Sequence, residues 1–159
     1  MTKTGKNLFT GFSNSTDTLS SGITVVFSDG MHVNISGTTN SANADTSVKG
    51  NGGTARHRII FEKGKTYIAS LSGTFSLTGS GDSVRLMLQN DGGVVWHAVS
   101  TTGVWEIIPE EDFIVDRLRF RIPTKGTVVN IDADFQIEVG PEATEFESYN
   151  GNIYEVSLS

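Results

Sequence analysis

The segment 129–139 alternates strictly between apolar and polar side chains, and this pattern constrains the fold more than any other feature of the chain. The apolar positions are Val129, Ile131, Ala133, Phe135, Ile137 and Val139; the polar positions are Asn130, Asp132, Asp134, Gln136 and Glu138. Successive side chains of a β-strand point to opposite faces of the sheet. The segment is therefore predicted to be a strand with one buried face and one solvated face.

Shorter segments of the same kind recur between clusters of Gly, Asn and Asp. We predict further strands over 24–27, 31–36, 58–61, 66–75, 83–89, 94–99 and 113–122, and a short edge strand near 46–49 within a long polar loop over 37–56. Asp29-Gly30, which lies between two of these runs, is a hairpin signal. Convincing helical periodicity is absent, and 109–112 has room for one helical turn at most.

These patterns predict an all-β protein. The 159 residues fit one domain, with a lead-in over 1–20 and a lead-out over 141–159. Alternation, rather than continuous apolar runs, indicates antiparallel sheets with solvated outer faces. We expect an antiparallel β-sandwich of about eight to ten short strands, with a jelly roll as the favoured topology.

Alternation also predicts which side chains face the core. Inward positions are Val84, Leu86 and Leu88 in one strand, Tyr67, Ala69 and Leu71 in a second, and Ile114, Leu118, Phe120 and Ile122 in a third. Outward positions are Arg85, Met87 and Gln89, and then Arg117, Arg119 and Arg121. Trp96 and His97 must face opposite ways. We predict Trp96 inward and His97 exposed, because large aromatic side chains are usually buried; the reverse assignment stays open.

Charge and cysteine content exclude several classes of function. The net charge of −6 argues against nucleic-acid binding, which depends on clustered Lys and Arg. Without Cys there are no disulfides, no cysteine-based zinc sites and no thiol nucleophile. We predict no transmembrane segment and no membrane partner, because no apolar stretch approaches the roughly 18–20 residues that span a bilayer. The first ten residues lack the apolar run of a secretory signal peptide.

The arginines of 117–121 are the main candidates for binding chemistry. Arg117, Arg119 and Arg121 are expected near Asp132, Asp134 and Glu138 on a paired strand. This arrangement is either a ladder of cross-strand ion pairs or a planar set of donors and acceptors for sugar hydroxyls. Under the second interpretation, Arg85, Gln89 and His97 extend the same surface.

Trp105 follows a Thr-Thr-Gly turn and has two possible roles. It either stacks on a sugar ring or packs at the edge of a loop.

No motif predicts catalysis or a defined metal site. The chain has no G-x-S-x-G and no P-loop, so we expect that it is not an enzyme. His32, His57 and His97 lack zinc-ligand spacing. Glu110-Glu111-Asp112 is expected to be a solvated turn. A structural Ca²⁺ is possible through carboxylate oxygens, but its ligands are not assigned.

Several segments, taken in order, are similar to modules of phage and prophage tail proteins from Gram-positive bacteria. Gly5-Lys6-Asn7-Leu8-Phe9 resembles their "GKNLL/GKNLF" opening. The hairpin from Gly22 to Thr38 resembles "GITFTVNADGTVTVNGTAT". Further matches are Lys63 to Gly73 with "KAGTYTLSG", Arg85-Leu86 with "YRL", and Ile137 to Gly151 with "QLEEGSTATEYEPYTG". Ser148 stands where that last motif has Pro, and residues 37–56 are longer and richer in Asn and Gly than usual.

The resemblance implies a galactose-binding-like jelly roll of the carbohydrate-binding-module type, excised from a longer tail, fibre or baseplate protein. The implied function is attachment of the phage particle to a bacterial cell-surface polysaccharide. The implied partners are that polysaccharide and other tail subunits, with a homo-oligomer possible through the parent protein. The implied location is the virion or an extracellular injection particle. Two alternatives remain: a structural spacer or assembly module of the tail, and a small polysaccharide hydrolase.

Overall fold

The computed structural model describes residues 2–4, 7–53, 56–148 and 153–155, and these residues form an all-β structure without an α-helix. No helix in this part of the chain is therefore long and apolar enough to cross a membrane. Gly5, Lys6 and the Tyr149-Asn150-Gly151 stretch of the opening and closing motifs lie outside the described residues.

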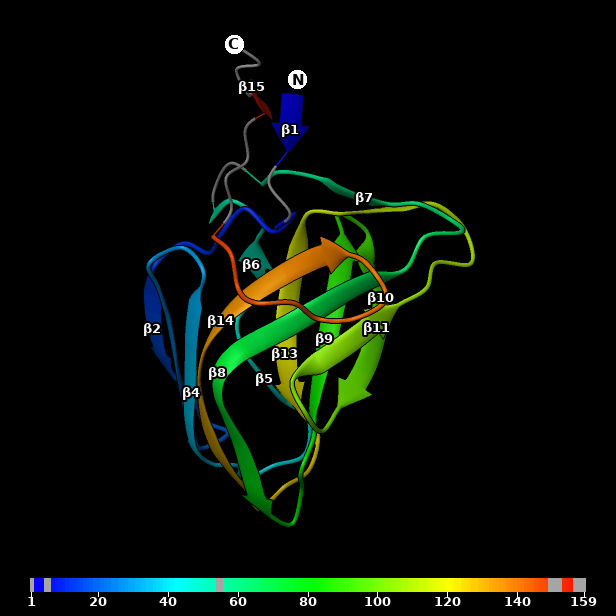
Figure 1. The fold of residues 1–159 in the computed structure, drawn as a ribbon. Helices are drawn as coiled ribbons and strands as arrows, with labels where there is room; N and C mark the ends of the chain where they lie inside the picture. The colour runs from blue at the N-terminus through cyan, green and yellow to red at the C-terminus, as the bar shows by residue number, and fades with distance from the viewer. Residues whose placement is uncertain (1, 5–6, 54–55, 149–152, 156–159) are drawn as a thin grey trace.

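A six-stranded antiparallel sheet forms one layer, in the order β11-β8-β14-β4-β3-β2. Its strands are β2 (Ser15–Thr18), β3 (Ile23–Ser28), β4 (His32–Thr38), β8 (Tyr67–Gly79), β11 (Val104–Ile107) and β14 (Thr127–Val139). The long strands β8 and β14 pair along their whole shared length and cross the front of the view in Figure 1. The strictly alternating segment is thus a central strand.

A five-stranded antiparallel sheet forms the second layer, behind the first in Figure 1. Its main strands are β9 (Val84–Asn90), β10 (Gly93–Ser100) and β13 (Arg117–Ile122). The short strands β5 (Ala44–Asp45) and β6 (Lys49–Gly50) both pair with β13. The polar loop therefore contributes two short edge strands, which flank the single predicted strand near 46–49.

Two small sheets complete the fold. Strand β7 (Ile59–Phe61) pairs with β12 (Phe113–Val115), and β1 (Thr2–Thr4) pairs with β15 (Ile153–Glu155). The second pair brings the two ends of the chain to the same end of the molecule (Figure 1).

The core lies between the two large sheets. Ile131 and Phe135 of β14 are fully buried, as are Leu86, Leu88 and Phe120 of the facing sheet. Rings from both layers meet there: the centroids of Phe120 and Phe135 are 5.4 Å apart at an interplanar angle of 88°. This packing confirms the predicted β-sandwich, while the jelly-roll topology stays a prediction.

The predicted hairpin is present between β3 and β4. Ser28 pairs with His32, and the turn between them places Asp29 and Gly30 at φ angles of 52° and 75°. Positive φ is tolerated by Gly and, among other residues, best by Asn and Asp. The Asp-Gly sequence therefore specifies this turn directly.

Three side chains differ in burial from what the predicted alternation indicates. Ile114 is 40% exposed, because Asp116 separates β12 from β13 and breaks the alternation that links Ile114 to Leu118. Met87 points outward but is buried at 5% exposure, with its sulfur 3.5 Å from Arg119 Nε. Val139, at the end of β14, is 55% exposed.

Gln136 and Glu138 also differ from the prediction, because both are buried although they are on the polar side of β14. The chain that follows β14 covers them: Thr144 and the backbone N–H of Glu147 bond to their side chains. The polar face of this strand is therefore solvated only along its first part.

Candidate functional site

Strand register places six predicted site residues on one face of the five-stranded sheet. Arg85, Met87 and Gln89 of β9 lie directly opposite Arg121, Arg119 and Arg117 of β13, and His97 of β10 lies opposite Met87. Directly paired residues of an antiparallel sheet share a face. We call this surface the arginine face; it consists of Arg85, Gln89, His97, Arg117, Arg119 and Arg121.

One carboxylate, Asp45 of β5, serves two of these arginines. Its oxygens accept hydrogen bonds from Arg121 Nε at 2.5 Å and Arg121 Nη2 at 3.0 Å, and one lies 3.8 Å from Arg119 Nη1. The bidentate bond to Asp45 raises the pKa of Arg121, so this guanidinium stays charged. The geometry ties β5 to β13, and among the described carboxylates Arg119 has only this long ion pair.

Arg117 is occupied at the other end of the face. Its Nη2 donates to the Asn90 carbonyl at 2.7 Å and to Asp91 at 2.9 Å, and its Nε donates to Asp116 at 3.2 Å. These bonds fix the turn between β9 and β10 against the start of β13. Arg117 therefore has a structural role.

Arg85 has no carboxylate partner among the described residues. Its Nη1 donates to His97 Nδ1 at 3.1 Å. Its Nε and the Gln89 Oε1 atom are shielded from solvent and lack a hydrogen-bond partner within the described part of the chain. Shielded polar atoms without partners are costly and uncommon. Both atoms are therefore left unsatisfied beneath the surface, and the Arg85 guanidinium is not neutralised by any described carboxylate.

Apolar surface lies between the charged groups. Val99, directly opposite Arg85, is 49% exposed, whereas Met87 is buried beneath Arg119 and adds no exposed surface. Sugar rings have apolar faces as well as hydroxyls, so a surface that mixes the two kinds of group can contact both.

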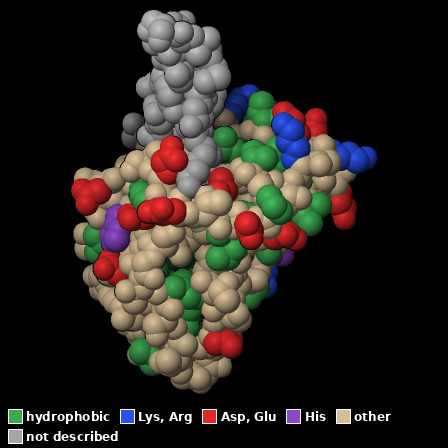
Figure 2. Space-filling view, in the orientation of Figure 1, with side chains coloured by type: hydrophobic (Ala, Val, Ile, Leu, Met, Phe, Trp, Pro, Cys, Tyr) green, Lys and Arg blue, Asp and Glu red, His purple; other side chains and the backbone are tan. Residues whose placement is uncertain are grey.

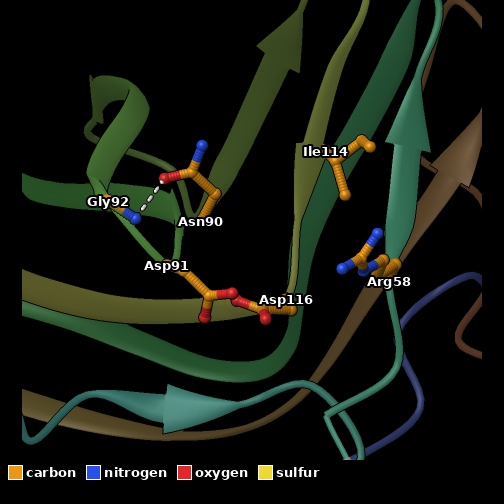
Figure 3. A pocket seen from close by; sticks show the side chains of 6 residues that line it. All are labelled: Arg58, Asn90, Asp91, Gly92, Ile114 and Asp116. Carbon is orange, nitrogen blue, oxygen red and sulfur yellow. Dashed lines mark hydrogen bonds between the residues drawn. The ribbon is translucent and has the colours of Figure 1, made fainter.

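A hollow of about 220 Å³ lies where the arginine face ends. It is lined by Arg58, Asn90, Asp91, Gly92, Ile114 and Asp116 (Figure 3). The carboxylates of Asp91 and Asp116 point toward each other, with Arg58 and Ile114 on the other side. Small-molecule sites usually measure about 300–1,000 Å³, so this hollow suits only a small group such as one sugar unit.

The predicted pairing of these arginines with Asp132, Asp134 and Glu138 is wrong. The three acidic residues belong to β14, which is in the other sheet and pairs with β4 and β8. Alternation predicted the outward direction of Asp132 and Asp134 on their strand but carried no information about which strand lies beside it.

Asp132 and Asp134 instead hold His32 of β4. Its Nε2 lies 2.5 Å from Asp132 Oδ1 and its Nδ1 lies 2.9 Å from Asp134 Oδ1. Because carboxylates only accept, both ring nitrogens must donate, which requires the imidazolium form. Both bonds raise the pKa of His32, and the bond to Asp132 has the larger effect. The bond from His32 in turn lowers the pKa of Asp132.

Trp105 does not lie on a binding surface. It is 2% exposed, and its Nε1 donates to the Val84 carbonyl at 3.2 Å. The suggestion that it stacks on a sugar is therefore wrong: alternation within β11 turns its side chain into the core, opposite to exposed Val104 and Glu106.

Trp96 faces the core side of β10 and His97 is exposed, as predicted, but Trp96 is only partly buried. It lines a second hollow of about 290 Å³ together with Ile108, Pro109, Glu110, Glu111 and Phe113. Within the described residues there is no cluster of three or more His, Asp or Glu side chains suited to a metal ion.

Sequence reasoning missed Asp45 and Met87 as components of the arginine face. Asp45 lies in the polar loop, 76 positions away from its partner Arg121, and no local pattern connects the two. Met87 follows the alternation outward, but its burial depends on Arg119 from the neighbouring strand.

Comparison with known proteins does not assign a family. No protein-family model matches the sequence, and no curated protein matches it. Among solved structures, the "Glycosylation Associate Protein (Gap123) complex" from Streptococcus agalactiae is similar with a TM-score of 0.40 and 15% identity. The match covers 84% of this chain and 27% of that chain, and a likeness at this level bears on neither fold nor function.

Proposed function

We propose that the protein is a non-catalytic glycan-binding module of a phage tail, fibre or baseplate, and that the arginine face contacts a polysaccharide of the bacterial cell surface. The observation that carries the proposal is the row of outward-facing guanidinium groups on β9 and β13, in which Arg85 pairs with no described carboxylate and Arg119 makes only a long ion pair with one. The phage-tail context comes from the ordered sequence motifs, which support a location on the virion or on a related extracellular particle.

The chemistry of the face is suited to sugars. Guanidinium groups present several donors in a rigid fork. Val99 supplies exposed apolar surface beside Arg85. An open sheet face competes with water for each hydroxyl, so single-site binding is weak and many copies on one particle supply avidity.

The test is retention of the protein on purified wall and capsule polysaccharides of candidate hosts, alongside a glycan array. A variant with Arg85→Ala and Arg119→Ala should lose retention, since it removes the two arginines that lack a close carboxylate. The matched control carries Thr74→Ala and Ser76→Ala, two exposed positions on the other sheet. Circular dichroism and thermal melting confirm that both variants fold.

Equal retention of the double-arginine variant and the wild type would contradict the assignment of the face. Absence of retention on every polysaccharide would contradict glycan binding itself.

A second candidate function, assembly of the tail, is favoured by one observation. Ile60 of β7 and Ile114 of β12 pair directly and are 57% and 40% exposed. Side by side, they form an apolar spot that suits contact with a neighbouring subunit. Under this alternative the protein associates with other tail domains and does not bind polysaccharide.

A further inference from the structure

Charge is segregated between the two large sheets. The strands of the six-stranded sheet contain five acidic residues and no Lys or Arg: Asp17, Glu106, Asp132, Asp134 and Glu138. The strands of the five-stranded sheet contain one acidic residue, Asp45, and five basic residues. The basic residues are Lys49, Arg85, Arg117, Arg119 and Arg121. A chain with a net charge of −6 therefore has one basic sheet.

The charged side chains on the surface over the six-stranded sheet are mainly acidic. Figure 2 views the six-stranded sheet from outside: acidic side chains are spread over this face, and basic ones appear only toward its right-hand side. On the basic sheet, Lys49 bonds to Ser15 and lies over the Phe27 ring, away from the arginine face. The four arginines thus carry the positive charge of that outer surface.

The arginine face contains a like-charge pair that the fold relieves on one side only. Arg85 and Arg121 lie directly opposite each other on β9 and β13, an arrangement that is destabilising by itself. Asp45 neutralises the Arg121 side through its bidentate bond, and no described carboxylate pairs with Arg85. An anion placed beside Arg85 would remove the repulsion.

Asp45 also shows how an anion sits on this surface. Its two oxygens bond to Arg121 and extend toward Arg119, which is the forked geometry that arginine offers to carboxylates and phosphates alike. In Arg85 and Arg119 the Nε groups are shielded or bonded to Met87, whereas Nη2 forms no hydrogen bond with the described residues and is the group available for an external anion.

We propose that the polysaccharide bound by the arginine face is anionic, with phosphodiester or carboxylate groups that contact Arg85 and Arg119. This inference rests on the proposed function and names the substrate class of the same surface. The acidic sheet does not oppose binding strongly. Packed sheets lie about 10 Å apart, and charges on the two outer surfaces are separated by more than the Debye length of about 8 Å at physiological salt.

The first test measures retention on three pure polymers: poly(glycerol phosphate), hyaluronate and neutral dextran. We expect retention on at least one of the two anionic polymers and none on dextran; the polymer preferred identifies phosphodiester or carboxylate as the recognised group. Retention should fall on the order of tenfold between about 50 mM and about 200 mM salt, as for a few charge contacts with a polyanion.

Variants with opposite expected effects make the test specific. Arg85→Gln should lower retention by about tenfold, the loss expected for one charge-assisted hydrogen bond, and Arg85→Lys should restore part of it. Lys63→Gln removes the same charge from an exposed turn on another part of the molecule and should have no effect. Asp45→Asn should increase retention, because it releases Arg119 and Arg121 from their carboxylate; thermal melting checks that this variant folds.

Each other outcome overturns the inference. Equal, salt-insensitive retention on dextran and on the anionic polymers would leave glycan binding intact but show that charge is not recognised. Retention on host wall polysaccharide without retention on either anionic polymer would also show that the protein binds a glycan but does not recognise its charge. Salt-sensitive self-association in sedimentation, with no retention on any polymer, would identify the acidic sheet of a second copy as the partner of the arginine face and would overturn the proposed function as well.

Discussion

His32 illustrates how a single side chain acquires a charge from its neighbours. Strand pairing places it beside both Asp132 and Asp134. A neutral imidazole has one donor and one acceptor, and an acceptor cannot bond to a carboxylate. The two short contacts therefore favour the protonated ring, and the pKa of His32 is raised for this reason.

The raised pKa makes stability dependent on pH. A group whose pKa is higher in the folded state stabilises the fold fully below its unfolded pKa of about 6.5, and this contribution disappears as the pH rises through the folded pKa. Between about pH 5.5 and pH 8.5, the melting temperature of the wild-type protein should fall by about 1–3 °C because His32 loses its proton. This is the effect expected for the loss of one largely exposed ion pair. His32→Gln should lack this loss.

The control is His57→Gln, because His57 is exposed and lies in a loop. Its melting temperature should follow that of the wild type across the same pH range. An unchanged pH dependence in the His32 variant would contradict the charged-ring interpretation.

Strand β14 shows how one element changes its environment along its length. Its first part has the alternating burial predicted from the sequence, whereas Gln136 and Glu138 near its end are covered by the segment 141–147. Glu138 accepts bonds from Gln136 Nε2 at 2.9 Å and from Thr144 Oγ1 at 2.6 Å. These buried polar bonds attach the chain that leaves β14 to the surface of the sheet.

Glu138→Ala should therefore act on more than one side chain. Gln136 and Thr144 lose a buried acceptor, which should cost about 1–3 kcal/mol in the free energy of unfolding, and the segment 141–147 should become accessible to proteases. Urea denaturation and limited proteolysis measure the two effects. Asn130→Ala, an exposed position on the same strand, should change stability by less than about 0.5 kcal/mol.

The outcome that would contradict this account is equal proteolysis of the two β14 variants at positions 141–147.

At the scale of the whole molecule, the two sheets are joined by a cluster of aromatic rings around Phe135. Its ring centroid lies 5.0 Å from that of Phe9, 5.4 Å from that of Phe120 and 6.1 Å from that of Phe12. Phe120 belongs to the facing sheet, and Phe9 and Phe12 come from the segment before β2. The cluster thus connects three parts of the chain that are distant in sequence.

Phe135→Ala should destabilise the fold by about 3–5 kcal/mol, because it removes a fully buried ring and leaves a cavity between the sheets. Chemical denaturation monitored by Trp fluorescence measures the change. Phe75→Ala, at a partly buried position on the neighbouring strand, should cost clearly less. Similar losses for both variants would show that Phe135 has no special role in joining the sheets.

The sequence could predict the candidate site only in part. Alternation placed Arg85, Gln89, Arg117, Arg119 and Arg121 on outward faces, and the register confirms that they share one surface with His97. It could not identify Asp45 as the shared carboxylate or exclude Asp132 and Asp134, since these assignments depend on which strands are neighbours.

Side-chain period by itself determined that the chain is all-β, where the principal strands run and which face of most of them is buried, because a pleated strand displays its residues alternately whatever lies next to it. Only the tertiary structure decided that β13 pairs with β9 rather than with β14 and that basic and acidic residues occupy separate sheets. The hydrogen bonds that pair strands join backbone groups common to every residue. The side-chain pattern of one strand therefore specifies its faces but does not name its neighbour.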